Sequence, residues 1–149
     1  MAGNVFMIGD LHLGHKNIMG FGQRDFTCIE DHNEAIVQAW NTVVGKRDIV
    51  WVLGDVCMDM KDMPLFDRMR GDKRLILGNH DRFDIQVYAR YFNGVGAFEK
   101  RYGVIMTHIP IHPGELQYRT WRWNVHGHIH DIKKQPKDDR YINVEIDGS

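Results

Sequence analysis

The stretch Val5-Phe6-Met7-Ile8-Gly9-Asp10-Leu11-His12 shows a pattern that recurs through the chain: a short apolar run ends in a glycine and then in polar residues. Similar runs lie at 49–53, 75–77 and 104–106 and at Val125, followed by Gly54-Asp55, Gly78-Asn79-His80-Asp81, Thr107-His108 and His126-Gly127-His128-Ile129-His130. Continuous apolar runs are typical of strands that are buried on both faces. We therefore expect short buried strands, each ending in a polar turn.

The segment between the first two runs predicts the best-defined helix. Thr27-Cys28-Ile29-Glu30 has the form of a capping box, in which a hydroxyl and a carboxylate satisfy the first backbone amides. Apolar residues then recur at helical spacing, and Gly45 supplies a C-terminal stop. The residues of this stripe are Ile36, Val37, Trp40, Val43 and Val44. We interpret the stripe as core packing.

Two shorter helices are predicted at 64–69 and at 84–92, where Asp84 is a candidate cap. Residues 112–121 and 131–140 are interpreted as surface connections. The segment 141–146 alternates apolar and polar residues and predicts a strand with one wetter face. Strands alternating with helices indicate an α/β fold. Because no repeat or linker interrupts the pattern, we expect one domain over residues 1–149.

Composition narrows the class of protein. The chain has 149 residues, of which 43% are hydrophobic and 26% are charged, as in ordinary globular proteins. A formal net charge of -1 argues against a dedicated binder of duplex nucleic acid, although a small nucleotide needs only a few local cations. Cys28 and Cys57 form no metal or disulfide motif and are expected to be reduced thiols. Neither a signal peptide nor a membrane span is evident, so the cytoplasm is the expected compartment.

Seven of the polar residues that follow the apolar runs are of types whose side chains bind metal ions in proteins. They are Asp10, His12, Asp55, Asn79, His108, His128 and His130. Ligands of α/β sheets bind at the carboxyl ends of the strands, where turns from several strands converge. A mixture of oxygen and nitrogen donors suits Mn²⁺, Fe or Zn²⁺ better than Ca²⁺ or Mg²⁺. Seven ligands exceed one tetrahedral site but fit two ions, roughly 3.5–4 Å apart, that share a carboxylate.

Five short motifs together carry a family resemblance. They are D-x-H at 10–12, G-D at 54–55, G-N-H-D at 78–81, a histidine at 108 and G-H-x-H at 127–130. With these motifs, the chain resembles the calcineurin-like metallophosphoesterase superfamily over Val5 to Ile146, and within it the small, uncapped bacterial and phage members. The resemblance implies a two-sheet β-sandwich flanked by helices, in layers ordered αββα.

The resemblance also implies how the ligands divide between the ions. The division is Asp10, His12 and His130 for the first ion, Asn79, His108 and His128 for the second, and Asp55 as the bridge. His80 would face the substrate as a catalytic residue. Several phosphatases of the superfamily extend the second motif to G-D-x-x-D-R-G, whose second aspartate supports that histidine, but residues 54–59 lack this spacing. The protein-phosphatase branch is therefore disfavoured, and Asp81 is the adjacent candidate for orienting His80.

The implied activity is hydrolysis of a phosphoester by a water molecule that two metal ions activate, with His80 protonating the leaving oxygen. Mn²⁺ is the expected metal, with Fe, Zn²⁺ and Ni²⁺ as alternatives. A small phosphodiester, with nucleotides among the candidates, is favoured over a monoester because no monoester clamp is evident. A phosphomonoesterase, a nuclease of the superfamily and a non-catalytic scaffold of this fold stay open as alternatives. The oligomeric state is open.

Several further residues have two interpretations each. His15 and Lys16 either contact substrate phosphate or cap a short helix. Arg24 is interpreted as part of a surface salt bridge rather than as a phosphate clamp, and His112 as a residue at the site rim. His32 is expected on a solvated helix face.

The remaining candidates lie late in the chain. His126 should point away from His128 in a strand and is left out of the metal shell. A mixed group of cations and aromatic rings is interpreted as covering a sheet edge or a subunit contact, rather than as a platform for a nucleobase. The members of this group are Arg119, Trp121, Arg122 and Trp123.

Overall fold

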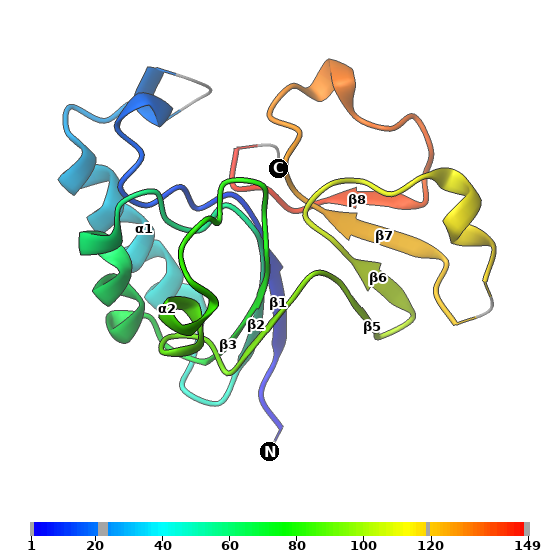
Figure 1. The fold of residues 1–149 in the computed structure, drawn as a ribbon, viewed down its shortest axis with the longest axis horizontal. Coiled ribbons are helices and arrows are strands. Elements are labelled where there is room, and N and C mark those ends of the chain that lie inside the picture. Colours follow the sequence, from blue (N-terminus) through cyan, green and yellow to red (C-terminus); the bar gives the residue numbers. More distant parts are fainter. Residues whose placement is uncertain (1, 21–23, 119, 148–149) are drawn as a thin grey trace.

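Four parallel strands form the first sheet of the computed structural model, which describes residues 2–20, 24–118 and 120–147. The strands, in spatial order, are β1 (Val5–Ile8), β2 (Ile49–Leu53), β3 (Asp72–Ile76) and β4 (Gly94–Gly96). In the register of the sheet, Met7 lies beside Trp51, which lies beside Arg74. The parallel arrangement brings the carboxyl ends of these strands to one edge of the molecule (Figure 1).

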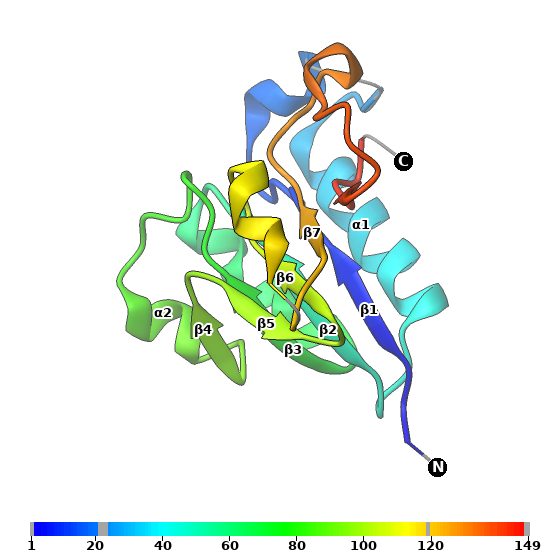
Figure 2. The same ribbon diagram turned by 90° about the vertical axis from the view of Figure 1, so that its right-hand side faces the viewer.

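A second sheet of four strands packs beside the first (Figures 1 and 2). Its strands, in spatial order, are β5 (Glu99–Arg101), β6 (Val104–Met106), β7 (Trp123–His126) and β8 (Tyr141–Asn143). Only the β5–β6 pair is antiparallel. Main-chain hydrogen bonds from Gly9 N to Val144 O (2.9 Å) and from Ile146 N to Gly9 O (3.2 Å) join the two sheets. The end of β1 therefore lies next to the chain that leaves β8.

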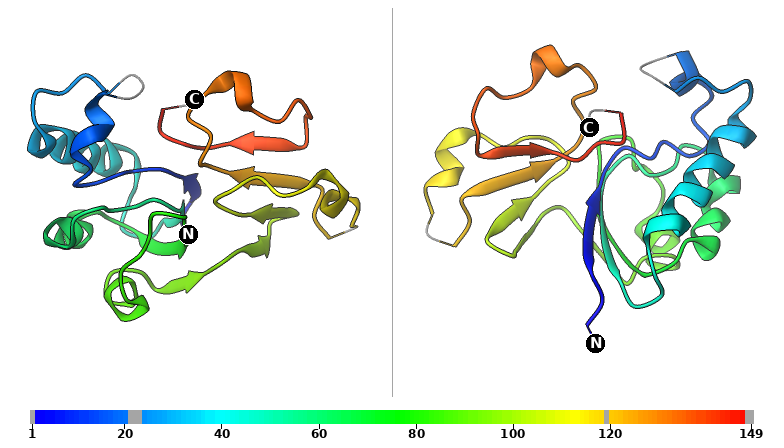
Figure 3. Two further views of the ribbon diagram at one scale, coloured as in Figure 1. Left: turned by 45° about the horizontal axis from the view of Figure 1, so that its top comes forward. Right: turned by 180° about the vertical axis from the view of Figure 1, so that it is seen from behind.

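The first sheet is buried on both faces, as its continuous apolar runs predict. Val50 and Val52 of β2 point into a core shared with the helices, whereas Trp51 and Leu53 point into a core between the sheets. The helices over the first sheet are α1 (Ile29–Val43), α2 (Ile85–Ala89) and the 3-10 helix η2 (Met60–Arg68) (Figure 3). The prediction of an α/β protein with two sheets is confirmed.

The predicted start of the long helix is wrong. Helix α1 begins at Ile29, so Cys28 occupies the cap position, and Thr27 instead donates its hydroxyl to Asp31 (3.3 Å). Four residues of the apolar stripe are buried, as predicted, but Val43 is 62% exposed. Val43 is the last residue of α1 and lies along a groove beside the edge strand β1, where no further strand of the described chain covers it.

Other local predictions are confirmed in part. Asp84 caps α2 by accepting a hydrogen bond from Gln86 N (2.8 Å). The helix predicted at 64–69 is the end of the longer η2. The two surface connections contain the 3-10 helices η3 (Pro113–Gln117) and η4 (Ile132–Lys134). Over residues 2–20, 24–118 and 120–147, no helix is long and apolar enough to cross a membrane.

Candidate metal centre

All seven predicted ligands lie directly after strands, in loops that converge where the two sheets meet. Asp10 and His12 follow β1, Asp55 follows β2, Asn79 follows β3, His108 follows β6, and His128 and His130 follow β7. The backbone of these loops is unusual. Five non-glycine residues of the described chain have φ in the left-handed region, and four of them are predicted ligands: Asp10 (60°), His12 (51°), Asp55 (53°) and His128 (71°). Such strained conformations concentrate at functional sites.

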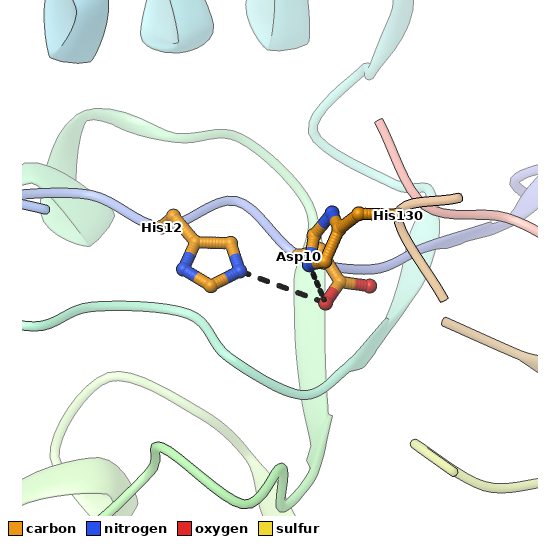
Figure 4. Close-up of side chains that lie close together, drawn as sticks. All are labelled: Asp10, His12 and His130. Atoms are coloured by element: carbon orange, nitrogen blue, oxygen red, sulfur yellow. Dashed lines mark ion pairs between the residues drawn. The ribbon is translucent and has the colours of Figure 1, made fainter. Parts of the chain in front are cut away.

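The first cluster contains Asp10, His12 and His130. Asp10 Oδ1 lies 3.7 Å from His12 Nε2 and 3.5 Å from His130 Nε2. Figure 4 shows both imidazole rings approaching the same carboxylate oxygen. Asp10 and His12 are buried, and His130 is the exposed member of the cluster. One oxygen and two nitrogen atoms therefore face a common point.

The second cluster contains Asp55, His108 and His128. His108 Nε2 lies 3.4 Å from Asp55 Oδ2 and 2.8 Å from Asn79 Oδ1, so Asn79 adjoins this cluster. Asp55 Oδ2 also lies 3.8 Å from His12 Nε2 of the first cluster. The carboxylate of Asp55 therefore stands between the two clusters, where a shared ligand belongs.

Backbone groups hold these carboxylates in place. Asp10 Oδ2 accepts a hydrogen bond from His128 N, and Asp55 Oδ1 accepts one from His80 N, each at 2.9 Å. A Cβ atom at Gly127 would overlap the Asp10 carboxylate, and one at Gly78 would overlap that of Asp55. Glycine at these two positions lets the backbone approach the carboxylates closely. One oxygen of each carboxylate is thus fixed by the protein, and the other faces the clusters.

The donor atoms fit a divalent cation at each cluster. Within the described part of the chain, Asp10 Oδ1 and both ring nitrogens of His12 are buried without a hydrogen-bond partner. A buried carboxylate oxygen without a partner is costly, and a bound cation removes that cost. His108 Nδ1 lies 2.7 Å from Leu53 O, an arrangement that leaves Nε2 available to a metal ion. The donor set combines carboxylate, amide and imidazole groups, which suits a transition metal.

The electrostatics of Asp55 and His128 agree with this chemistry, whereas for His108 burial would lower the pKa but the hydrogen bond to Asp55 raises it. Burial would raise the pKa of Asp55, but its hydrogen bond and charge interaction with His108 lower that pKa to about 2. Burial lowers the pKa of His128, and the neighbouring His108 lowers it further. At neutral pH these two side chains are therefore the anionic carboxylate and the neutral imidazole that bind metal ions.

His80 lies beside the centre without joining either cluster of the described residues. Its side chain is exposed, and its ring centroid is 6.2 Å from that of His12. His15 is a second neighbour, with its ring centroid 5.3 Å from that of His12 and Nδ1 buried. His15 also directly precedes the 3-10 helix η1 (Lys16–Gly20), where its main-chain oxygen accepts a hydrogen bond from Ile18 N (3.0 Å), so the structure is compatible with both interpretations of His15.

The carboxylate of Asp81 is held by backbone amides. It accepts hydrogen bonds from Gly78 N (2.7 Å), Asp55 N (2.8 Å) and Val56 N (2.9 Å). Asp81 therefore joins the loops after β2 and β3, and its role in orienting the ring of His80 stays a prediction. The carboxylate satisfies backbone amides in tight turns, which adjacency in the sequence did not indicate.

Arg24 was misplaced by the sequence interpretation, because its salt bridge is buried. Its guanidinium donates to the main-chain oxygens of Asp10 and Leu11, which lie in the ligand loop after β1. It also forms a two-pronged pair with Asp147, with Nε–Oδ1 at 2.6 Å and an Nη2–Oδ2 distance of 2.8 Å. His32, predicted to be solvated, is fully buried with Nε2 3.0 Å from the guanidinium. The partner Asp147 is 123 residues away, which local sequence patterns do not reveal.

Asp147 connects this buried arginine to a predicted ligand. Asp147 Oδ2 lies 3.3 Å from His130 Nδ1, and the buried Glu145 Oε2 lies 3.7 Å from the same nitrogen. Burial would raise the pKa of Asp147, but hydrogen bonds with His130 and Arg24 lower it to about 2. A carboxylate that holds the outer nitrogen of a histidine fixes the orientation of a metal-ligating ring. Asp147 and Arg24 are therefore supporting residues of the first cluster that the sequence analysis did not identify.

The other candidates lie outside the two clusters. His126 is buried, with Nδ1 2.8 Å from Gly127 O. His112 is exposed and caps η3, where its Nδ1 accepts a hydrogen bond from Gly114 N (3.1 Å). The Lys100 ammonium lies 4.5 Å from the ring centre of Trp121, so this aromatic residue covers the second sheet locally. Arg119 lies outside the described residues.

Comparisons with known proteins place the chain in a family. No model of a known protein family matches it. The uncharacterized protein MJ1445 of Methanocaldococcus jannaschii is 31% identical over 96% of this chain and 81% of its own length. The gene 66 protein of Mycobacterium phage L5 is 30% identical over 85% of this chain and 77% of its own. A crystal structure of the protein of unknown function AQ665 from Aquifex aeolicus shares the fold, with a TM-score of 0.73 at 21% identity over 96% of this chain and 90% of that one. The chain therefore belongs to the family of MJ1445 and the phage gene 66 protein.

Proposed function

We propose that the protein is a metal-dependent phosphodiesterase with a binuclear centre, acting on a small phosphodiester. The observation that carries the proposal is the position of Asp55, whose Oδ2 lies 3.8 Å from His12 Nε2 and 3.4 Å from His108 Nε2. In the proposed centre, Asp55 would be shared by two ions. The first ion would be held by Asp10, His12 and His130, and the second by Asn79, His108 and His128. This arrangement corresponds to the metallophosphoesterase-type site that the sequence motifs resemble.

Two divalent cations at these clusters would neutralise charge on a phosphate group and lower the pKa of a water molecule. The chain itself supplies the proton. The exposed imidazole of His80 stands beside the centre, where it protonates the leaving oxygen of the substrate. The backbone of His80 donates to Asp55 Oδ1, so the proton donor keeps a fixed position relative to the bridging carboxylate.

The contacts of Arg24 favour a diester over a monoester as the substrate. A phosphomonoester carries an additional charge, which enzymes often engage with an arginine in a two-pronged contact. Arg24 is the arginine that the sequence offers for this role, and both prongs of its guanidinium are occupied by Asp147. Mn²⁺ is the proposed metal, since the donors combine carboxylate and imidazole groups, and Fe, Zn²⁺ and Ni²⁺ suit the same set.

The proposal is tested by hydrolysis of an activated aryl phosphodiester. Purified protein with Mn²⁺ is expected to hydrolyse bis(p-nitrophenyl) phosphate faster than p-nitrophenyl phosphate. Excess chelator should reduce the rate to that of the buffer alone, and renewed Mn²⁺ should restore it, because the donor atoms alone cannot activate water. A rate that is unchanged by chelator would contradict metal dependence. Faster hydrolysis of the monoester would contradict the choice of a diester.

A further inference from the structure

A groove opens beside the metal centre on the side of the second sheet. Its volume is about 720 Å³, and it is lined by residues 109–110 of the loop after β6 and by residues 128–131, 134 and 136 of the loop after β7. His128 and His130 of the two clusters form part of its lining, so the groove is continuous with the proposed phosphate position. A pocket for a small molecule typically has about 300–1,000 Å³. The groove therefore has room for a substituent of the substrate, and not only for its phosphate.

The walls of the groove are held by hydrogen bonds from neighbouring strands and turns. Thr107 Oγ1 donates to Ile109 O (2.7 Å), which fixes the loop after β6. On the other wall, Ile129 O accepts hydrogen bonds from Gln135 Nε2 (2.9 Å) and Asn143 Nδ2 (3.4 Å). A preformed groove binds its ligand with a smaller loss of conformational entropy than a mobile one.

The chemistry of the walls is mainly aliphatic. Ile109 and Pro110 lie on one side, and Ile129 and Pro136 on the other. Ile109 is 50% exposed, so its side chain is accessible to a ligand in the groove. Flat rings and aliphatic groups gain free energy by covering such side chains. A substrate with only small alkyl substituents would leave these walls in contact with water.

The two charged residues of the groove bear on which class of substituent it binds. Lys134 Nζ lies 4.0 Å from Asp131 Oδ2, so the ammonium is balanced by a carboxylate. A second phosphate group would meet both charges and gain little from the pair. Both side chains are exposed to solvent, so they can donate to and accept from a polar substituent, whereas a lipid tail gains nothing from them. A neutral ring with polar edges and hydroxyl groups satisfies both the aliphatic walls and the charged pair.

We propose that this groove binds the nucleoside of a nucleoside phosphodiester, whose phosphate lies at the metal centre. This inference rests on the proposed function, because the groove takes its importance from the adjacent clusters. The base contacts the aliphatic walls, and the polar edge of the nucleoside faces Lys134 and Asp131. The groove is thus the determinant of substrate class.

The test compares two diesters that have the same leaving group. Thymidine 5′-p-nitrophenyl phosphate carries a nucleoside, whereas methyl p-nitrophenyl phosphate carries a methyl group. With Mn²⁺, we expect kcat/KM to favour the nucleoside substrate by about tenfold or more, as contacts in a specificity pocket do. In Ile109→Asp, this ratio should fall towards one, because a charge replaces an aliphatic wall. Ile132→Asp is the matched control, since Ile132 is 79% exposed in the adjacent η4, and it should keep the wild-type ratio.

The outcomes separate the groove from the proposed function. If the chain hydrolyses neither diester, the proposed function fails, and the inference about the groove fails with it. If it hydrolyses both with equal kcat/KM, the groove inference fails while the proposed function stands. A higher kcat/KM for a long-chain alkyl p-nitrophenyl phosphate would assign the groove to a lipid and overturn the inference. Binding gives an independent readout: thymidine 5′-monophosphate should inhibit about tenfold more strongly than inorganic phosphate in the wild type, and Ile109→Asp should remove that difference.

Discussion

Substitution of His80 by alanine is expected to lower kcat about 10²- to 10⁴-fold, the usual contribution of a positioned general acid, while both metal ions stay bound. The metal centre should survive because the hydrogen bond to Asp55 Oδ1 comes from the backbone of His80, which alanine retains. The loss should be greater for a diester with an alkoxide leaving group than for one that releases p-nitrophenolate. A poor leaving group depends more strongly on a proton donor.

The measurement combines steady-state kinetics with metal analysis of the purified variant. His112→Ala is the matched control, because His112 is an exposed histidine that caps η3. Loss of metal from the His80 variant would show that its ring is a ligand. Unchanged turnover with both leaving groups would remove His80 from the mechanism.

Substitution of Arg24 by methionine is expected to destabilise the metal-free protein by about 3–5 kcal/mol, the cost of leaving a buried charge without its partner. The change removes the cation beside Asp147 and the donors to the main-chain oxygens of Asp10 and Leu11. Because Asp147 also contacts His130, the affinity of the first cluster for Mn²⁺ should fall by about 10- to 100-fold. Denaturant unfolding and metal titration measure the two effects.

Two further variants make this prediction specific. Arg68→Met removes an arginine of the same kind, whose pair with Glu34 is exposed, and should change the unfolding midpoint little. The double variant Arg24→Met with Asp147→Leu replaces both charges by apolar groups and should regain part of the lost stability. An Arg24 variant that unfolds like Arg68→Met would contradict the structural role assigned to the buried pair.

The sequence predicts the elements that are long or strongly patterned. The run 49–53 is apolar throughout because alternate residues of β2 enter different cores, and such a run is readable without a structure. The strands β4 and β5 were not predicted, since Gly-Val-Gly and Glu-Lys-Arg lack the apolar run that indicated β6, which also has three residues. The start of α1 was predicted one residue too early, because Thr27 matched a capping motif whereas Cys28 occupies the cap position.

The members of the two clusters were predicted better than the residues that hold them in place. Asp10, Asp55 and His128 follow strands directly, so their proximity follows from parallel topology. Arg24 and Asp147 meet only because the chain leaving β8 returns beside β1, a contact across 123 residues. Asp81 was assigned to its sequence neighbour, although its carboxylate binds the backbone of another loop. Roles that depend on distant partners require the fold.

The central claim is that the two clusters each hold one metal ion and share Asp55. The most direct test is titration of the metal-free protein with Mn²⁺, with bound metal measured after gel filtration, for the wild type and for Asp55→Ala. Two ions per chain are predicted for the wild type. For Asp55→Ala we expect weaker binding of both ions, or loss of bound metal, because the shared oxygen faces both clusters. One ion or none in the wild type, or two ions bound with undiminished affinity by Asp55→Ala, would contradict the claim.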